Sequence, residues 1–437
     1  MTVTLTTKSW LDDIVDQHSE LESPLSFWRW GALASIAAVV KDNVWLDRQI
    51  YKLYPNIYVM FHAESGLKKG PPISMAKQLV KAVNNTRVIS GRSSIQGILK
   101  DLGTGKTLPG GKVVGDASAF ICSSELSSSI VEDKVATTIL TDLYDRQYNV
   151  GEWRSLLKME TFQLKNPTIS MLTATNEAHS TDFFGRKDVQ GGYFARTFII
   201  YENIANRSNA LLVPLKNPPN YEKSAEYLKQ LSQLKGAFEP LGSIYETEIH
   251  SIKYYDRTTN EKFYLNPAGY VYQEWYDNFK EQIKRDEIKD ETGTLNRFGD
   301  SVLKVAMLMS LARAPELKID EQSMSDAIAS CEKLVGNIRK TTLGQKGLST
   351  SSVLKTKVIE ELFNRTPHMI SRPMLMKKMW MHYSDISELD NMMSSFHEAG
   401  LITTSNHGTT VMYTMPDSQI EEWTEFFSGK IAKKGRR

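Results

Sequence analysis

Cysteine is nearly missing from this sequence, with only Cys122 and Cys331 among 437 residues. Two cysteines are too few for a four-sulfur zinc site, and they exclude the network of disulfide bonds that stabilises small secreted proteins. We therefore expect a protein of a reducing cytoplasm, without a bound structural metal. A chain of this length buries two or three hydrophobic cores, which predicts two or three domains.

The sequence also lacks an excess of charge and a long hydrophobic run. Its 53 basic residues nearly balance 51 acidic residues, which excludes a generally basic DNA-coating protein but leaves local basic patches open. The apolar run at residues 27–40 contains Arg29 and is about six residues too short to span a bilayer, so we expect a buried helix and no membrane contact. No signal-peptide pattern occurs near the N-terminus.

Residues 56–83 are the most informative part of the chain. Residues 57–61 form a short apolar run rich in β-branched and aromatic side chains, which predicts a buried strand. Apolar residues then recur at helical spacing up to Val83, starting from Ile73. The stretch is therefore predicted to fold as a strand, a tight loop and a helix, which is the layout of a phosphate-binding loop.

The loop itself has the composition of an anion cradle. Ser65, Gly66 and Gly70 allow the backbone to curl around a phosphate, and Lys68 and Lys69 add positive charge at the start of the helix. Aligned on Lys69, the pattern departs from G-x-x-x-x-G-K-[ST] at three positions, which are Ala63, Lys68 and Gly70. Because a Gly/Lys loop between a strand and a helix is also common as a plain turn, both interpretations stay open here.

A second string, GTGKT at residues 103–107, looks like the end of a phosphate loop. Lys100 occupies the position of its first glycine, no strand precedes it, and the LPGG sequence after it breaks any helix. We therefore reject it as a nucleotide site and expect a connecting loop.

Polar residues follow two further predicted strands. Glu125 comes just after the apolar run 118–123 and suits the polarisation of an attacking water, although Ser124 stands where an aspartate is usual. Asn176 follows the strand predicted at 168–173 and suits a hydrogen bond to that water or to a γ-phosphate. The alternatives are a solvated loop carboxylate and an ordinary turn residue.

The remaining candidate site residues are basic: Arg196 and the cations of a predicted hairpin. Arg196 precedes a predicted strand at 197–201 and is either a surface ion-pair partner or a phosphate ligand for a neighbouring subunit. Residues 142–160 read as a hairpin turning near Gly151, whose rings and cations suit a nucleic-acid strand as well as a plain solvated hairpin. Its candidate nucleic-acid contacts are Arg146, Arg154 and Lys158.

Composition divides the chain into five segments. We expect an N-terminal helical segment at 1–50, an α/β core at 51–205, a helical lid at 206–345, a winged-helix domain at 353–416 and a basic tail at 417–437. The third helix of the predicted winged helix has no Lys or Arg at 387–400, which favours protein contact or weak DNA contact. The last nine residues hold five basic charges and suit a solubilising tail better than a nucleic-acid tether.

The order of these features, over residues 9–343, resembles the helicase-like P-loop ATPases of phages and mobile elements. These are found with primases and are related to AAA+ and superfamily 3 helicases. The resemblance implies an α/β P-loop NTPase core of the AAA+/RecA-like kind that binds ATP and Mg²⁺. By this resemblance Lys69 is the Walker A lysine, Glu125 the Walker B glutamate, Asn176 the sensor-1 residue, Arg196 the arginine finger and Arg297 the sensor-2 cation. Arg297 lies near the start of an amphipathic helix predicted at 295–312, and the alternative for it is a first-turn arginine bonded to a local carboxylate.

The resemblance also implies a biological setting. It predicts a homo-hexameric ring that hydrolyses ATP to move on single-stranded DNA. This motor would act in replication of a phage or mobile element, in the cytoplasm of a bacterial host. A primase or a replication-initiation protein is the expected partner. The departures from the metal-binding positions favour an alternative, a nucleotide-dependent DNA-binding or helicase-loader protein with little or no hydrolysis. A scaffold with a vestigial loop is the third interpretation.

Overall fold

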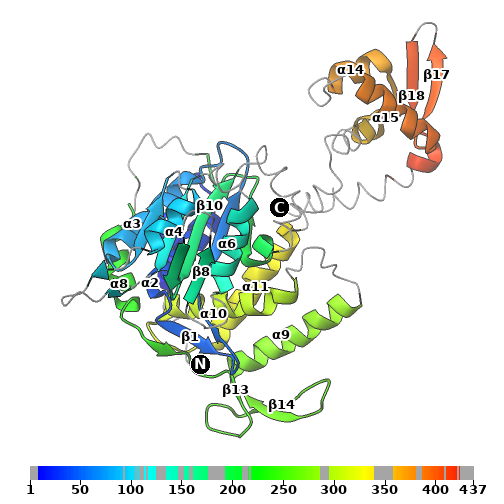
Figure 1. The fold of residues 1–437 in the computed structure, drawn as a ribbon. Coiled ribbons are helices and arrows are strands. Elements are labelled where there is room, and N and C mark those ends of the chain that lie inside the picture. The colour runs from blue at the N-terminus through cyan, green and yellow to red at the C-terminus, as the bar shows by residue number, and fades with distance from the viewer. Residues whose placement is uncertain are drawn as a thin grey trace. The chain divides into compact units, whose positions relative to one another are not determined.

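The computed structural model divides the chain into two compact units, Met1–Thr341 and Thr342–Arg437. It describes residues 8–91, 94–103, 106–107, 113–114, 117–124, 134–145, 152–156, 161–175, 192–208, 215, 218–285, 295–338, 358–379, 386–407, 410–420 and 423. Figure 1 shows the helices and strands of each unit.

A five-stranded, all-parallel sheet forms the centre of the first unit. Its strand order is β11-β3-β10-β7-β4, so the chain order and the spatial order differ. The strands are β3 (Tyr58–His62), β4 (Arg87–Ser90), β7 (Ser118–Ser123), β10 (Thr168–Thr175) and β11 (Thr197–Tyr201). All five residues of β3 are buried, as expected of a continuous apolar run in a parallel sheet that is covered on both faces.

Helices cover both faces of this sheet. On one face α2 (Leu25–Val40) and α3 (Gly70–Val83) share a core with Val59 and Phe61 of β3. On the other face α4 (Ile95–Gly103) and α6 (Lys134–Asp145) pack with Tyr58 and Met60. The alternation of side chains along β3 therefore divides one strand between two cores. Together these layers confirm the predicted α/β architecture.

The predicted N-terminal segment and helical lid join the same unit as the sheet. The first core also contains residues of α1 (Trp10–Gln17), α8 (Tyr221–Leu231), α9 (Pro267–Lys284), α10 (Phe298–Arg313) and α11 (Glu321–Ile338). Ser9 caps α1, since its hydroxyl accepts a hydrogen bond from the Asp12 N–H at 3.1 Å. The boundaries expected near residues 50 and 206 therefore do not separate compact units.

Short strands complete the first unit. β1 (Val44–Asp47) pairs with β2 (Lys52–Leu53) and with β12 (Gly236–Ala237). β5 (Lys106–Thr107) pairs with β6 (Val113–Val114), so the rejected GTGKT string leads into a strand and not a helix. Among the helices that the structure describes, none is long and apolar enough to cross a membrane.

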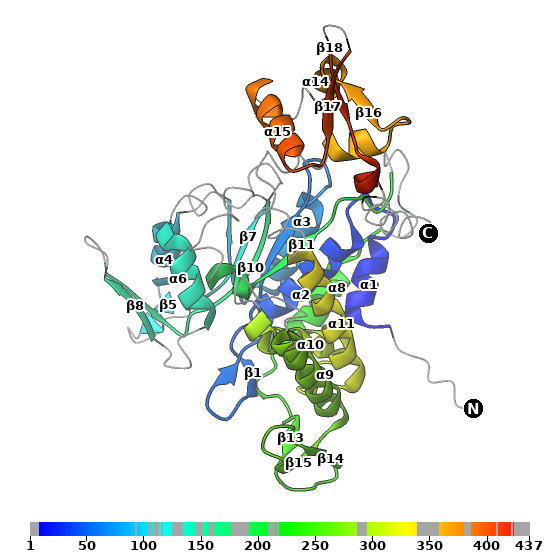
Figure 2. The same ribbon diagram turned by 90° about the vertical axis from the view of Figure 1, so that its right-hand side faces the viewer.

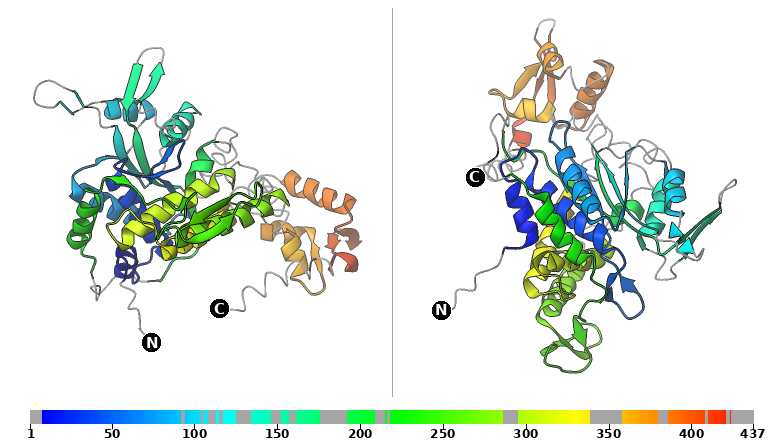
Figure 3. Two further views of the ribbon diagram at one scale, coloured as in Figure 1. Left: turned by 90° about the horizontal axis from the view of Figure 1, so that it is seen from below. Right: turned by 90° about the vertical axis from the view of Figure 1, so that its left-hand side faces the viewer.

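Two antiparallel extensions project from the body of the first unit. One is the hairpin of β8 (Glu152–Leu156) and β9 (Thr161–Lys165), and the other is a small sheet of β13 (Gly242–Ser243), β14 (Ile252–Tyr255) and β15 (Lys262–Leu265). Figure 2 shows β8 at one side of the unit and the small sheet at another end, beyond α9, and the right-hand view in Figure 3 agrees.

The hairpin predicted at 142–160 is shifted along the chain. Residues 142–145 form the last turn of α6, because the helical spacing of Ile139, Leu140 and Leu143 continues to bury them. The hairpin instead runs over 152–165, with Glu152 paired to Lys165 and Leu156 paired to Thr161.

The second unit has a separate core of its own. Residues 358–363 are helical and are followed by β16 (Met369–Ser371), α14 (Arg372–Met379), α15 (Ile386–Glu398), β17 (Thr403–His407) and β18 (Thr410–Thr414). The strands form a sheet of order β16-β18-β17. β16 was not among the elements expected from the sequence. Gly400 has φ +72°, as expected after the end of α15.

Candidate functional site

The loop predicted to bind phosphate lies at the carboxyl edge of the parallel sheet. In the strand register His62 is level with Thr175 of β10 and with Tyr201 of β11, and Ser123 of β7 is level with Thr173. The strands that lead to Lys69, Glu125 and Asn176 therefore all end at one edge. Glu125 and Asn176 themselves lie outside the described residues.

The backbone of this loop adopts the unusual conformation that its glycine allows. Gly66 has φ +95° and Lys68 has φ +49°, both in the left-handed region. A side chain added at Gly66 or Gly70 would meet no described heavy atom within 4 Å. Ser65 and Gly66 are exposed. Both glycines thus face open space within the described part of the chain, which leaves room beside the loop for a ligand.

Lys69 folds back across the loop. Its Nζ donates hydrogen bonds to the backbone oxygens of Ala63 at 2.6 Å and Glu64 at 2.9 Å. The ammonium group is therefore already held above the turn by two acceptors. A phosphate oxygen bound at the loop would compete with these two carbonyl oxygens for the N–H donors of Lys69. The phosphate has the advantage of a negative charge, which the carbonyl groups lack.

The rest of the loop is anchored to the entry of α2. The hydroxyl of Ser23 donates to the Lys68 backbone oxygen at 2.7 Å, and the Lys68 Nζ lies 3.8 Å from a carboxylate oxygen of Glu22. Leu67 packs on the first core. Lys68 thus neutralises a neighbouring carboxylate, which makes Lys69 the better placed of the two cations for a ligand.

The start of α3 is poorer in hydrogen-bond donors than the sequence interpretation assumed. Pro71 and Pro72 occupy its first turn and carry no N–H group, so two of the usual free donors are missing. The first turn also has no acidic residue, which leaves the positive end of the helix dipole unopposed. The helix therefore attracts an anion mainly through its field and through Gly70.

His62 lies directly before the loop, at the end of β3. Burial, together with the nearby charge of Lys69, lowers the pKa of His62 to about 4. The imidazole is therefore neutral at physiological pH and adds no charge beneath the loop.

The expected Mg²⁺ ligands do not fit. Gly70 has no side-chain oxygen to replace the usual Ser or Thr hydroxyl, and Ser124 offers a hydroxyl in place of a carboxylate. No group of three or more His, Cys, Asp or Glu side chains occurs among the described residues in an arrangement that could hold a metal ion. We therefore assign no step of the chemistry to a metal held by the protein.

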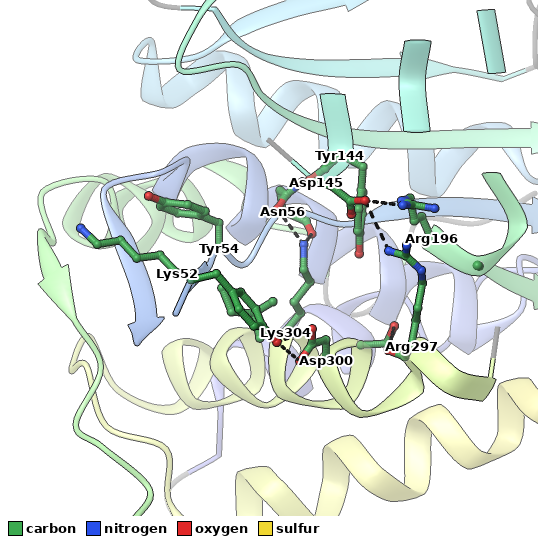
Figure 4. A pocket seen from close by; sticks show the side chains of 13 residues that line it. Lys52, Tyr54, Asn56, Tyr144, Asp145, Arg196, Arg297, Asp300 and Lys304 are labelled. Carbon is green, nitrogen blue, oxygen red and sulfur yellow. Dashed lines mark hydrogen bonds and ion pairs between the residues drawn. The ribbon is translucent and has the colours of Figure 1, made fainter. Parts of the chain in front are cut away.

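Arg196 and Arg297 meet at the opposite, amino edge of the sheet (Figure 4). Both guanidinium groups bind Asp145 Oδ2, Arg196 through Nη2 and Arg297 through Nη1 at 3.3 Å. Arg196 is buried, with 7% of its surface exposed, and also donates to the Gly192 backbone oxygen at 2.9 Å. Asp145 at the end of α6 therefore joins the start of β11 to the start of α10.

This position corrects the role expected for Arg297. Arg297 lines a pocket together with Asn56, which precedes β3, whereas Lys69 follows β3. Arg297 therefore lies at the opposite end of that strand from the phosphate loop of its own chain. The expected lid contact is therefore wrong for a site within one subunit. Arg196 lies at the same amino edge, on the far side of the sheet from its own loop, so a phosphate contact by either arginine requires a second subunit.

A buried lysine that the sequence did not suggest lines the same pocket. Lys304 of α10 donates from Nζ to the backbone oxygen of Asn56 at 3.0 Å and to Asn56 Oδ1 at 2.8 Å, and it lies 3.9 Å from the ring centre of Tyr144. Burial lowers the pKa of Lys304 to about 7, against the opposing effect of Asp145 and Asp300. The signal in the sequence is a single lysine inside the apolar helix 302–312.

The lowered pKa of Lys304 predicts a pH-dependent stability. Between pH 7 and pH 9 the unfolded chain keeps this proton while the folded chain releases it, so the free energy of unfolding rises with pH. We expect the unmodified protein to gain about 2 kcal/mol relative to Lys304→Met over this interval, measured by urea unfolding at both pH values. Parallel pH profiles of the two proteins would contradict this assignment.

The predicted nucleic-acid residues are only partly described. Arg154 lies in β8, where it pairs with Gln163 of β9. Arg146 and Lys158 lie outside the described residues. The structure thus describes the hairpin backbone, and the assignment of these three residues stays a prediction.

Comparison with known proteins adds no family. No protein-family model matches the chain, and no curated protein matches it in sequence.

Proposed function

We propose that this chain binds ATP in the loop of residues 63–70 and hydrolyses it as a motor on single-stranded DNA. One observation carries the proposal. The loop that holds Lys69 and the strands that lead to Glu125 and Asn176 all end at the same edge of an all-parallel sheet. In open α/β sheets this carboxyl edge is where ligands bind.

The sheet topology supports a nucleotide crevice at that place. The chain leaves β3 through α3 on one face, reaches the edge strand β4 and returns through α4 and α6 on the other face. The loops after β3 and β7 therefore turn to opposite faces, with β10 between them. β10 lies between β3, which leads to the loop, and β7, which leads to Glu125. This strand order also fits the AAA+ ATPases that the sequence resembles.

The proposed chemistry assigns one role to each residue. Lys69 binds the β- and γ-phosphate oxygens and balances the charge that develops on them. Glu125 accepts a proton from the water that attacks the γ-phosphorus, and Asn176 orients this water. The new bond from water to phosphorus forms as the bond to the bridging oxygen of the leaving ADP breaks.

The amino-edge arginines support action in a ring. Arg297 is 44% exposed at the edge of the sheet opposite the loop of its own chain, so it suits contact with the nucleotide of a neighbouring subunit in the proposed hexamer. Arg196 lies at the same edge but is buried, so in the proposed ring it would reach a neighbouring nucleotide only after a rearrangement. Asp145 now binds both, so subunit contact would have to redirect at least one guanidinium group.

The second unit supports a winged-helix assignment. Its order of helix, strand, two helices and a β-hairpin follows that plan. α15 carries no Lys or Arg, and Asp390 on this helix is engaged by Arg372 through two hydrogen bonds of 2.7 and 2.8 Å. We therefore propose that it contacts a primase or another replication protein more strongly than it contacts DNA.

ATP turnover stimulated by single-stranded DNA tests the proposal. We expect the purified chain to release phosphate from ATP and to do so faster when single-stranded DNA is added. A chain that binds ATP without turnover, with and without DNA, would instead support the loader alternative, which the prolines of α3 and the missing metal ligands favour. Absence of nucleotide binding would contradict both and support the scaffold.

A further inference from the structure

The outer face of the small sheet β13-β15-β14 carries two tyrosines and two lysines. Lys253 is directly opposite Tyr264, and Tyr255 is directly opposite Lys262. Cross-strand partners and residues two apart share one face of a sheet, so all four side chains point the same way. We call these four residues the tyrosine–lysine face.

This face is accessible and its rings and charges lie close together. Lys253, Tyr255 and Lys262 are exposed, with 48% of the Tyr255 surface accessible, and Tyr264 is half-buried. The Lys253 Nζ lies 5.2 Å from the Tyr255 ring centre, and the Lys262 Nζ lies 5.4 Å from the Tyr264 ring centre. Tyr255 and Tyr264 are diagonal neighbours on adjacent strands, and the backbones of such residues are about 7–8 Å apart.

The opposite face anchors the sheet firmly to α9. The hydroxyl of Tyr254 donates to Asp277 Oδ2 at 2.6 Å, and its ring lies edge-on to Tyr270. Arg257, in the turn after β14, forms ion pairs with Glu274 at 3.3 Å and Glu281 at 3.2 Å. The tyrosine–lysine face is therefore presented by a rigid support, and Arg257 is already committed to that support.

We propose that the tyrosine–lysine face binds a single strand of nucleic acid, with bases stacked on Tyr255 and Tyr264 and phosphates beside Lys253 and Lys262. Rings that stack on bases and cations that follow the backbone are the two elements of single-strand binding that is independent of sequence. The contacts between lysines and rings are weak at an exposed site, so a base displaces them readily.

The composition of the face favours a nucleic acid over a protein partner. Lysine is depleted from the centre of protein interfaces, whereas here lysines alternate with the rings at the centre of the patch. Acidic residues border it, since Glu246 interacts with Lys253 and Glu261 precedes Lys262. These carboxylates limit the affinity and confine the phosphate contacts to the two lysines.

Binding of a fluorescent oligothymidylate to the full chain without ATP tests this proposal. We expect Tyr255→Ala/Tyr264→Ala to weaken binding by about 5- to 150-fold per stacked base lost, whereas Tyr255→Trp/Tyr264→Trp retains it. The slope of log affinity against log salt concentration is negative, and we expect Lys253→Ala/Lys262→Ala to make it shallower by about 1.4. Lys223→Ala/Lys229→Ala, on α8, is the matched control and leaves that slope unchanged.

A double tyrosine-to-alanine variant that binds the strand as tightly as the unmodified chain overturns the proposal. Circular dichroism and thermal unfolding of each variant establish that the fold is retained. The inference does not depend on ATP hydrolysis. A Lys69→Ala chain is expected to keep its affinity for the strand, so failure of the motor and failure of the tyrosine–lysine face are separate results.

Discussion

Lys69→Ala is expected to lower the rate of ATP turnover by about 100- to 1,000-fold, which is the usual effect of removing one preorganised donor to transition-state charge. Lys69 is the cation that the structure holds across the loop, through its bonds to Ala63 and Glu64. In the proposed site, removing it leaves the γ-phosphate without its point charge. Phosphate release measured at saturating ATP, beside Glu125→Gln, gives the comparison.

The control for this prediction lies on the same helix. Lys81 is exposed in the last turn of α3, so Lys81→Ala removes an equal charge far from the loop and is expected to leave the rate unchanged. Equal rates for the unmodified chain, Lys69→Ala and Glu125→Gln would show that the loop is not a catalytic phosphate site.

Asp145→Asn is expected to lower the free energy of unfolding by about 3–5 kcal/mol, because it leaves the buried Arg196 guanidinium without its counter-charge. Asp145 is the shared acceptor of Arg196 and Arg297 and is itself largely shielded from solvent. An asparagine keeps the size of the side chain but supplies no charge. Urea unfolding at pH 7 measures the loss.

A second pair provides the matched comparison. Asp326 accepts from Arg313 at 2.7 Å, and both side chains are about one-third exposed, at 31% and 30%. Asp326→Asn is therefore expected to lower the free energy of unfolding by no more than about 1 kcal/mol. Equal losses in Asp145→Asn and Asp326→Asn would mean that the buried ion pair gives no special stability.

Local patterns predicted the elements that depend on neighbouring residues. The strand before the loop is a run of apolar side chains, and Ser9 stands next to the acidic first turn of α1, so both could be recognised without tertiary information. The hairpin error arose where two local signals competed. Gly151 suggested a turn, but burial of Leu143 extended α6 and moved the hairpin to 152–165.

Contacts between distant segments could not be predicted in the same way. Lys304 and Asn56 are 248 positions apart, and nothing beside either residue indicates the other. Arg297 was expected at the nucleotide because it begins a helix of the predicted lid. The packing of α10 under the amino edge of the sheet brings it to Asp145 instead.

The strand, the glycine turn and the helix that surround Lys69 are encoded locally, since each follows from the spacing and backbone preference of a few neighbouring residues. The tertiary structure alone decided which strand ends meet that turn, which edge receives the arginines, and which face of the small sheet reaches solvent. Those outcomes depend on the order of strands in a parallel sheet and on burial of one side of each element, and both are fixed only when remote parts of the chain pack together.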